Sequence, residues 1–312
     1  MSRQSQLSDS PETSGLPRRV SDEARGLWLG FLAVVMFAVT LPMTRLAVGP
    51  ADAPQLHPVF VTAGRAAIAG LLSIVYLLVC RAQRPSRQHW VPLLVCAGGT
   101  VVGFPLFLGL ALRYTHATHA AVITGVLPLA TALAGALYFR QRPSVGFWLC
   151  ALTGCALVLG FAVYQGGGNV TGADLLLLLA VVAVALGYLG GARVTADMPA
   201  PYVISWVLVL SLPFTVPIAL ATLPNHPIRW ESWLALGYVA VFSMWLSFFA
   251  WYRGLALGGI VRVSQVQLLQ PFIALVLSVP ILGESLDAMT VVFALAVVAT
   301  VFISKRMPVH QA

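Results

Sequence analysis

The feature that most restricts the fold of this chain is a series of uncharged stretches, each about 17 to 30 residues long, between isolated arginines or acidic residues. Coiled as a helix, about 20 apolar residues cross the hydrocarbon core of a bilayer. Of the 312 residues, 59% are hydrophobic and only 9% are charged. A water-soluble domain is roughly 25% charged, so this chain lacks the charge to coat a water-facing surface. It is therefore predicted to be an integral membrane protein without a separate soluble domain.

Ten of these stretches are predicted to be transmembrane helices, because lipid offers backbone groups no other hydrogen-bond partner and because the residues lack the alternation of barrel strands. A turn at Gly166–Asn169 separates the fifth span from the sixth. Pro201, Pro213 and Pro217 predict that the seventh span is kinked or partly broken. The approximate ranges are 27–47, 58–79, 90–112, 117–138, 145–164, 174–192, 201–222, 232–252, 262–282 and 287–304.

The basic residues predict the orientation of these helices, because cytoplasmic loops are enriched in Lys and Arg. With the N-terminus in the cytoplasm, only Arg45, Arg113 and Arg229 face the other side, and Arg65 lies within a span. The polar segments 1–26 and 305–312 are then expected to be flexible cytoplasmic tails. The predicted location is the inner (plasma) membrane. The cytoplasmic basic residues are Arg3, Arg18, Arg19, Arg25, Arg81, Arg84, Arg87, Arg140, Arg142, Arg193, Arg253, Arg262, Lys305 and Arg306.

Sequence motifs of pumps and membrane enzymes are missing. Lys305 is the only lysine, so there is no phosphate-binding loop and no lysine within a span to hold retinal. No H-E-x-x-H occurs, and no two acidic residues lie close together within a span, which argues against a metalloprotease and a Mg²⁺-dependent transferase. The four cysteines lack C-x-x-C spacing and are interpreted as small core residues. We therefore expect no enzyme activity, no cofactor or metal, and no nucleic-acid partner.

An internal repeat relates the two halves of the chain. Gly109–Leu112 at the end of the third span matches Gly254–Leu257 at the end of the eighth, and a proline within an apolar helix follows each copy, Pro128 and Pro271. Five spans is an odd number, so the second copy lies upside down relative to the first. The sequence thus predicts two inverted five-helix repeats, an architecture of many secondary transporters. Their ranges are 27–164 and 165–304.

The residues of this repeat resemble the drug/metabolite transporter superfamily, in particular its ten-span permeases built from two EamA-type repeats. The likeness rests on residues 109–118 (GLALRYTHAT), residues 251–257 (WYRGLAL) and residues 282–284 (LGE), and it covers roughly residues 27 to 304. Arg65 looks like the basic residue that these proteins often carry in the second span. One departure is Gln141, where the family commonly has a glutamate at the end of the fourth span. Roles that need both glutamates are therefore not expected here.

Arg65 is a candidate substrate-binding residue because of its predicted depth in the membrane. It lies roughly 10 Å into the bilayer, where an arginine costs up to about 3 kcal/mol and must face the protein interior. Two interpretations stay open. The guanidinium either binds an anionic group of the substrate, which its planar fork suits, or has a fixed partner such as a helix-end carbonyl or Glu284.

The other candidate binding residues are polar or aromatic side chains near the repeat interface. Gln267 and Gln270 share one face of the ninth span, and Thr124 falls near Gln267 in the inverted copy. These groups either bond to neighbouring helices or line a wet cavity. An apolar wall around the substrate is predicted from the eighth span, formed by Trp245, Phe248 and Phe249.

Six residues are candidates for gating or coupling. Arg45 lies at the outer end of the first span, where it either guards the mouth of a cavity or extends to the membrane interface. His116 and His119 are three residues apart and are candidates for a proton relay, although a third ligand for a metal is not visible. Pro128 and Pro271 are candidate hinges. Glu284 completes the set.

The sequence thus predicts a secondary or facilitative transporter that works by alternating access. The family resemblance implies export of small metabolites, amino acids or amphiphilic compounds. The alternatives are a lipid or nucleotide-sugar translocator of related fold, or a membrane-embedded enzyme acting on a lipid-linked substrate. The expected partners are a small-molecule substrate and membrane lipid. A proton as coupling ion, and a monomer or a homodimer, stay open.

Overall fold

The computed structural model describes residues 16–138, 142–165, 169–195, 197–258, 266, 269–305 and 309–310, and these are almost entirely helical. The exception is a two-residue antiparallel pairing of β1 (Arg142–Pro143) with β2 (Val309–His310). The predicted all-α class is confirmed. The longer helices are α1 (Leu16–Ala38), α2 (Thr40–Val48), α3 (Pro58–Val79), α4 (Trp90–Cys96), α5 (Phe104–Ala111), α6 (Ala117–Thr124), α7 (Leu127–Tyr138), α8 (Val145–Gln165), α9 (Gly172–Thr195), α10 (Ala200–Ala221), α11 (Trp230–Tyr238), α12 (Ser247–Gly258), α14 (Gln270–Leu282) and α15 (Ala288–Lys305).

Several helical stretches are long and apolar enough to cross a membrane, by their length and composition. In the described part of the chain there are seven: Ala24–Val48, Pro58–Val79, Arg87–Ala111, Val145–Tyr164, Gly172–Thr195, Ala200–Ala221 and Trp230–Trp251. Three shorter apolar helices accompany them: Ala117–Thr131, Gln270–Leu282 and Ala288–Thr300. The protein is therefore a multi-pass membrane protein, and the number of ten spans stays a prediction.

The predicted partial break of the seventh span is wrong. The helix α10 runs unbroken from Ala200 to Ala221, with Pro213 and Pro217 inside it. Each proline removes one backbone hydrogen bond. In lipid, unwinding the helix would leave further backbone groups without partners, so the helix persists around both prolines.

Other spans are irregular where sequence analysis expects regular helices. Ala97–Gly103 between α4 and α5 form a π-helical segment, η2, and Val239–Leu246 between α11 and α12 form a second one, η3. Pro105, the second residue of α5, lacks the N–H that the carbonyl four residues earlier, within η2, would need, which favours local widening of the helix there. The fourth predicted span divides into α6 and α7 at Gly125–Val126.

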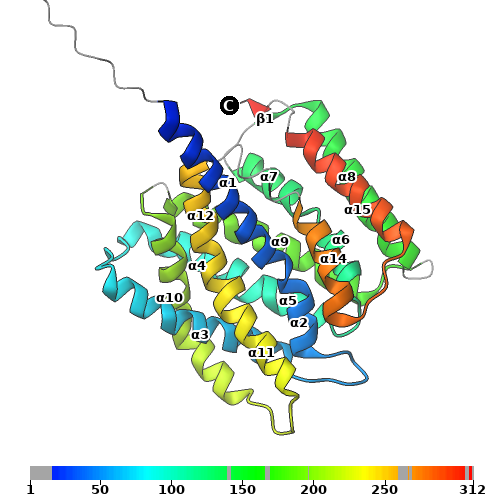
Figure 1. Ribbon diagram of the computed structural model, residues 1–312, viewed down its shortest axis with the longest axis horizontal. Coiled ribbons are helices and arrows are strands. Elements are labelled where there is room, and N and C mark those ends of the chain that lie inside the picture. Colours follow the sequence, from blue (N-terminus) through cyan, green and yellow to red (C-terminus); the bar gives the residue numbers. More distant parts are fainter. Residues whose placement is uncertain are drawn as a thin grey trace, which may run out of the picture.

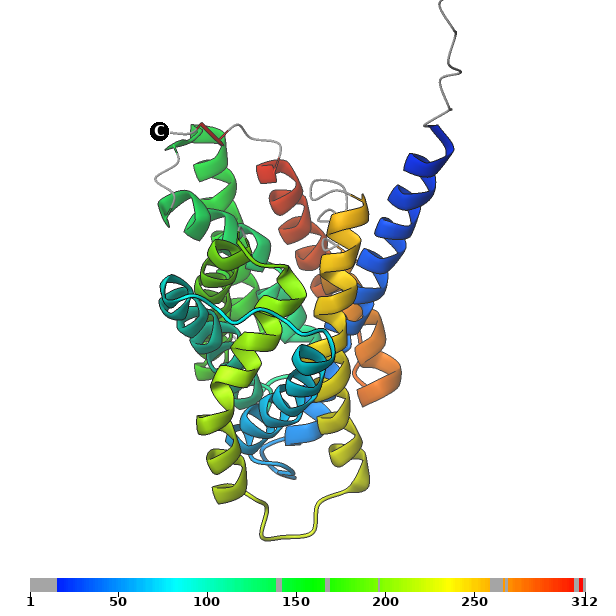
Figure 2. The ribbon, with the colours of Figure 1, turned by 90° about the vertical axis from the view of Figure 1, so that its left-hand side faces the viewer.

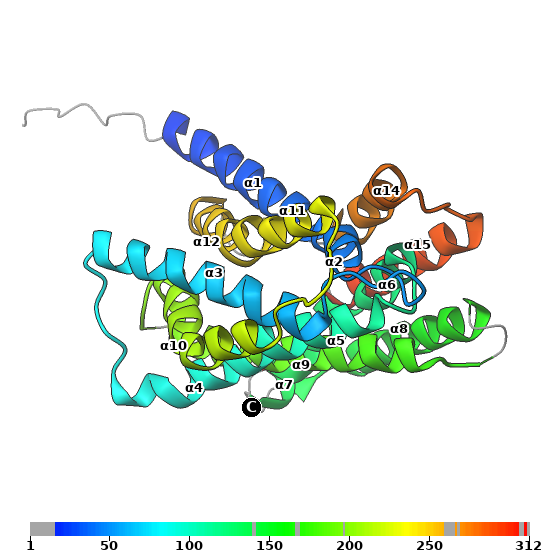
Figure 3. The same ribbon diagram turned by 90° about the horizontal axis from the view of Figure 1, so that it is seen from below.

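Long helices pack in pairs around a central region (Figures 1 and 3). The most extensive contacts join α3 to α10 and α1 to α12, followed by α8 with α15 and α9 with α4 and α5. The beginning of α1 and the C-terminus lie at one end of the bundle, which we call the terminal end (Figures 1 and 2). The opposite end, which we call the distal end, carries the loop 222–229 (Figure 2). It also carries the loops 49–57, 112–116 and 283–287, whose residues bond to one another.

Glycines allow α9 to lie directly against η2 and α4. A Cβ added at Gly99 would lie 2.6 Å from the Cα of Gly187, and one added at Gly187 would lie 2.9 Å from the backbone nitrogen of Thr100. Such small residues let membrane helices approach until their backbones touch. This contact fixes the position of α9 beside the central region.

Candidate functional site

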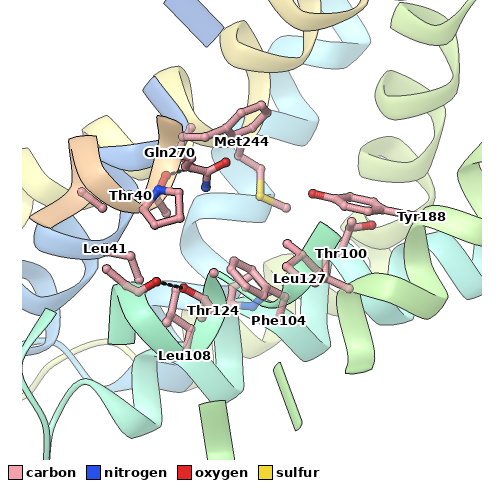
Figure 4. A pocket seen from close by; sticks show the side chains of 18 of the residues that line it. Thr40, Leu41, Thr100, Phe104, Leu108, Thr124, Leu127, Tyr188, Met244 and Gln270 are labelled. Carbon is pink, nitrogen blue, oxygen red and sulfur yellow. Dashed lines mark hydrogen bonds between the residues drawn. The ribbon is translucent and has the colours of Figure 1, made fainter. Parts of the chain in front are cut away.

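A central cavity lies between helices of both halves of the chain. Its wall comes from α1, α2, α3, η2, α5, α6 and α7 of the first half and from α9, η3, α12, α14 and α15 of the second. Figure 4 shows the Tyr188 hydroxyl, the Met244 thioether and the Gln270 amide projecting into this space. Its lining includes Phe37, Thr40, Arg65, Thr100, Phe104, Leu108, Thr124, Leu127, Tyr188, Ser243, Met244, Phe248, Gln270 and Pro271.

Arg65 supplies the only charge in the lining of this cavity that the structure describes. Its side chain is buried, with 3% of the residue exposed. Nη2 donates a hydrogen bond of 3.0 Å to the Ser243 hydroxyl, which also accepts one of 2.7 Å from Thr40. Within the described residues, Nε and Nη1 are buried and have no hydrogen-bond partner. The cavity therefore presents a guanidinium with unused donors.

The acid predicted as a fixed partner of Arg65 lies elsewhere. Glu284 follows α14 at the distal end and accepts hydrogen bonds from the backbone nitrogens of Ala117 (2.7 Å) and Thr118 (2.8 Å). These are the first two residues of α6, so the carboxylate caps that helix. No ion pair of Arg65 occurs among the residues described.

The remaining wall of the cavity is mainly apolar, with hydroxyl groups at separate positions. Phe104, Leu127, Met244 and Phe248 supply apolar surface. On the side opposite Thr40, Thr100 and Tyr188 contribute two further hydroxyl-bearing side chains to the lining (Figure 4). The lining thus combines one cationic region, a hydroxyl-bearing region and an apolar surface between them.

The structure brings together part of the binding site predicted from the sequence. Thr124, Gln270 and Phe248 line the cavity with Arg65. Trp245 and Phe249 do not belong to the cavity lining. They lie instead against Tyr76, with ring centroids 6.3 and 4.7 Å away.

Gln267 falls outside the described residues, so its position stays a prediction. Sequence analysis missed four hydroxyl-bearing residues of the lining: Thr40, Thr100, Tyr188 and Ser243. These residues could have been predicted from the sequence, because each is a hydroxyl-bearing residue within an otherwise apolar stretch.

A second hollow adjoins the cavity on the side of the terminal end. It shares Phe37, Thr100, Tyr188 and Phe248 with the central cavity and extends to Thr195, near the end of α9. Trp251 also lines it. The central cavity therefore continues towards the terminal end.

Hydrogen bonds link α2, the end of α5 and the neighbouring loops at the distal end of the bundle. Arg45 of α2, which is half-buried, donates to the carbonyl oxygen of Leu112 at the end of α5. Nη2 of Arg113 donates to the carbonyl oxygen of Leu56 over 3.4 Å. Burial lowers the pKa of the Arg113 guanidinium. Burial and the charge of Arg113 also lower the pKa of His57.

The candidate gating residues occupy this distal region and the cavity wall. Pro128 and Pro271 both stand in second position of a helix, α7 and α14 respectively, where a missing N–H costs no intrahelical bond. Pro271 lines the cavity. His116 immediately precedes α6 and is exposed. Whether these residues gate or couple transport stays a prediction.

His119, three residues further along α6, is buried and pairs with an acid that sequence analysis did not single out. Its Nε2 lies 2.6 Å from Oδ1 of Asp174, in the first turn of α9. The imidazole stacks on Phe161, with centroids 4.9 Å apart. The other carboxylate oxygen, Oδ2, accepts hydrogen bonds from the backbone nitrogen and the hydroxyl of Thr171. Within the described chain, no group of three or more His, Cys, Asp or Glu residues could hold a metal ion.

An all-helical membrane bundle with a mainly apolar central cavity and an isolated cation defines a membrane transport protein by its architecture. Comparison with known proteins gives its family. The model of the EamA-like transporter family matches residues 24–163 and again residues 171–305, so the chain belongs to that family. This confirms the predicted membership of the drug/metabolite transporter superfamily, and the protein is a transporter and not an enzyme.

A relative of this chain is the uncharacterized transporter YdeK of Bacillus subtilis (strain 168). The two are 44% identical over 282 residues, which cover 89% of this chain and 96% of YdeK. A solved crystal structure, described only as that of a protein, is similar with a TM-score of 0.60 and 18% sequence identity. That similarity covers 90% of this chain and 96% of the other, and it concerns the fold alone.

Proposed function

We propose that this transporter moves small organic anions that carry an apolar group, and that Arg65 binds the anion in the central cavity. The observation that carries the proposal is the pair of unpartnered nitrogens on this buried guanidinium. An ion taken out of water loses several kcal/mol of solvation free energy unless charges and hydrogen bonds replace it. The Ser243 hydroxyl replaces only one hydrogen bond. A substrate carboxylate would supply the remaining acceptors.

The shape of a carboxylate suits this site. Two carboxylate oxygens can accept parallel hydrogen bonds from neighbouring guanidinium nitrogens, and such charge-assisted bonds are about twice as strong as neutral ones. The apolar surfaces of Phe104, Met244 and Phe248 then favour a substrate with a hydrophobic body. Thr124 and Gln270 are the polar groups proposed to orient it, and Gln267 is kept as a predicted neighbour.

We further propose that the chain crosses the inner membrane ten times, as two inverted five-helix repeats over residues 27–164 and 165–304, with both termini in the cytoplasm. The double family match supports the repeat. In this arrangement the hollow beside Thr195 opens to the cytoplasm, and the distal contacts of Arg45 and Glu284 close the outer side. A substrate that enters from the cytoplasm and leaves after the distal contacts open is exported by alternating access.

The test compares binding of the anions 4-phenylbutyrate and 3-phenylpropionate with binding of 4-phenylbutyramide, the neutral amide of the first compound. Binding is measured by calorimetry on the purified protein, and flux is measured in vesicles that contain it. We expect the carboxylates to bind and the amide to bind at least about tenfold more weakly, because one charge-assisted hydrogen bond contributes about 1.5 to 3 kcal/mol. Equal affinity for acid and amide, or no binding of any of the carboxylates, would contradict the proposal.

The variant Arg65→Gln separates substrate binding from a structural role. It should bind carboxylates at least about 100-fold more weakly, because two charge-assisted hydrogen bonds are lost. Its thermal stability should be unchanged or higher, because a costly buried charge is removed. Arg84→Gln, at an exposed position, is the matched control. A destabilised Arg65→Gln with unchanged affinity would show that Arg65 is structural.

A further inference from the structure

The buried pair of His119 and Asp174 connects the two regions matched by the family model. His119 belongs to α6 in the first region, and Asp174 belongs to α9 in the second. Only 10% of the imidazole and 1% of the carboxylate side chain are exposed. The 2.6 Å separation of Nε2 and Oδ1 is short for a nitrogen–oxygen hydrogen bond, as expected when charge assists it. The pair therefore ties the halves together at the distal end.

One ring nitrogen of His119 remains available to take up a proton. Because an ionised carboxylate can only accept, the Asp174 contact places a hydrogen on Nε2. In the part of the chain described, Nδ1 has no hydrogen-bond partner, and it is not among the fully buried polar atoms. His119 lines two hollows at the distal end, and Asp174 lines one of them. Water in these hollows can deliver a proton to Nδ1.

Other charged and titratable groups surround this pair. The helices packed against α6 are α2, α8, α9, α14 and α15. Tyr114 and His116 line the hollow next to Asp174. The larger distal hollow is also lined by Arg45 of α2, Tyr164 of α8, Arg229 of the loop before α11, and Glu284 and Asp287 of the loop between α14 and α15.

Two of these neighbours have hydrogen-bond partners other than the imidazole. Glu284 accepts from the backbone of α6, and Arg45 donates to Leu112. Asp174 is the acid bonded to His119 among the residues described, so its charge has the largest effect on proton binding there.

We propose that His119 and Asp174 form a proton-binding site that controls opening of the distal end of the transporter. A proton from the distal solution adds to the lone pair of Nδ1 and converts the imidazole into an imidazolium, and no bond breaks. The hydrogen bond to Asp174 then joins two opposite charges and becomes stronger. Acid on the distal side therefore keeps α6 and α9 together and the cavity closed on that side. This control builds on the proposed transport cycle, whereas the proton site itself can be tested without any substrate.

The first test measures proton binding directly. Purified protein with ¹³C-labelled histidine is titrated by NMR, and the His119 signal is identified by its loss in His119→Gln. We expect Asp174→Asn to lower the proton affinity of His119 at least about tenfold, because a neighbouring negative charge stabilises the imidazolium by more than about 1.4 kcal/mol. The His116 signal should not change. Unchanged proton affinity of His119 in Asp174→Asn would overturn the proposal.

The second test measures opening of the distal end. The four native cysteines are replaced by serine, Thr124 in the cavity wall is replaced by cysteine, and a membrane-impermeant thiol reagent is added on the distal side. Labelling should slow as the distal pH falls from about 8 to about 5.5, the range in which histidine titrates. His119→Gln should remove this dependence, and the matched variant His116→Gln should keep it.

Either result of the second test is decisive even if Asp174→Asn does not fold. A pH dependence that survives in His119→Gln, or that is missing from the parent protein, would overturn the proposed control. Failure of the organic anions to bind would overturn the proposed substrate class and leave both proton measurements valid.

Discussion

The cap that Glu284 provides to α6 predicts a specific loss of stability in Glu284→Gln. The carboxylate accepts two backbone hydrogen bonds, of 2.7 and 2.8 Å, at the positive end of the helix dipole. A charge-assisted hydrogen bond contributes about 1.5 to 3 kcal/mol, so two contribute about 3 to 6 kcal/mol. The glutamine carbonyl can keep one neutral bond of about 1 kcal/mol. We therefore expect a net loss of about 2 to 5 kcal/mol.

The assay is thermal unfolding of the purified protein in detergent, followed by tryptophan fluorescence. A loss of this size should lower the apparent Tm by about 4 to 20 °C, from the usual 2 to 4 °C per kcal/mol in large domains. Glu231→Gln is the matched control, because this acid lies in the first turn of α11 and makes the same change of charge. The control should shift the Tm by no more than about 1 °C. Equal shifts in the two variants would refute the capping argument.

The same substitution should also loosen the distal end. The loop with Glu284 joins α14 to α15, whereas α6 lies in the other matched region. Losing this contact removes one connection between the halves. A cysteine at Thr124 should then react faster with a thiol reagent added on the distal side than it does in the Glu231→Gln background. A slower reaction would show that the cap does not hold the distal end closed.

Two further predictions concern topology and packing. Single cysteines at Gln83 and Asn169 should be labelled from opposite sides of the membrane, Gln83 from the cytoplasm, and labelling of both from one side would contradict the ten-span arrangement. Gly187→Ala should destabilise the protein by about 1 to 3 kcal/mol in thermal unfolding, because its Cβ would meet the backbone of η2. Gly237→Ala is the control, since a Cβ there meets nothing within 4 Å, and an equal effect of the two would show that close packing at Gly187 is not the cause.

The sequence predicts the helical class and the burial of Arg65 because both follow from one energetic rule. Uncharged stretches must satisfy their backbone groups within the membrane, and an arginine among them must face inwards. The division of the fourth span at Gly125–Val126 was not predicted. A proline in an apolar run is equally compatible with a kinked helix and with the start of a new one.

The partner of His119 was not predicted because it depends on tertiary packing. Thr171 and Asp174 have the spacing of a helix cap, and the observed hydrogen bonds between them agree with this local motif. That motif uses mainly Oδ2 of Asp174. The position of Oδ1 against a histidine 55 residues earlier depends on how α6 and α9 pack, which no local pattern contains.

The two π-helical segments each contribute a hydroxyl group to the cavity. Thr100 in η2 and Ser243 in η3 are separated by the same 143 residues as Pro128 and Pro271, so the repeat carries a hydroxyl into the cavity from each half. The same separation relates Arg65 to Leu208, which is fully buried. Both regions matched by the family model thus contribute a hydroxyl to the cavity, whereas the charged residue of the described lining, Arg65, comes from the first region. An anionic substrate bound to Arg65 would keep its charged group against the first half of the chain throughout the transport cycle. Its apolar end would contact different residues as the transporter changes conformation.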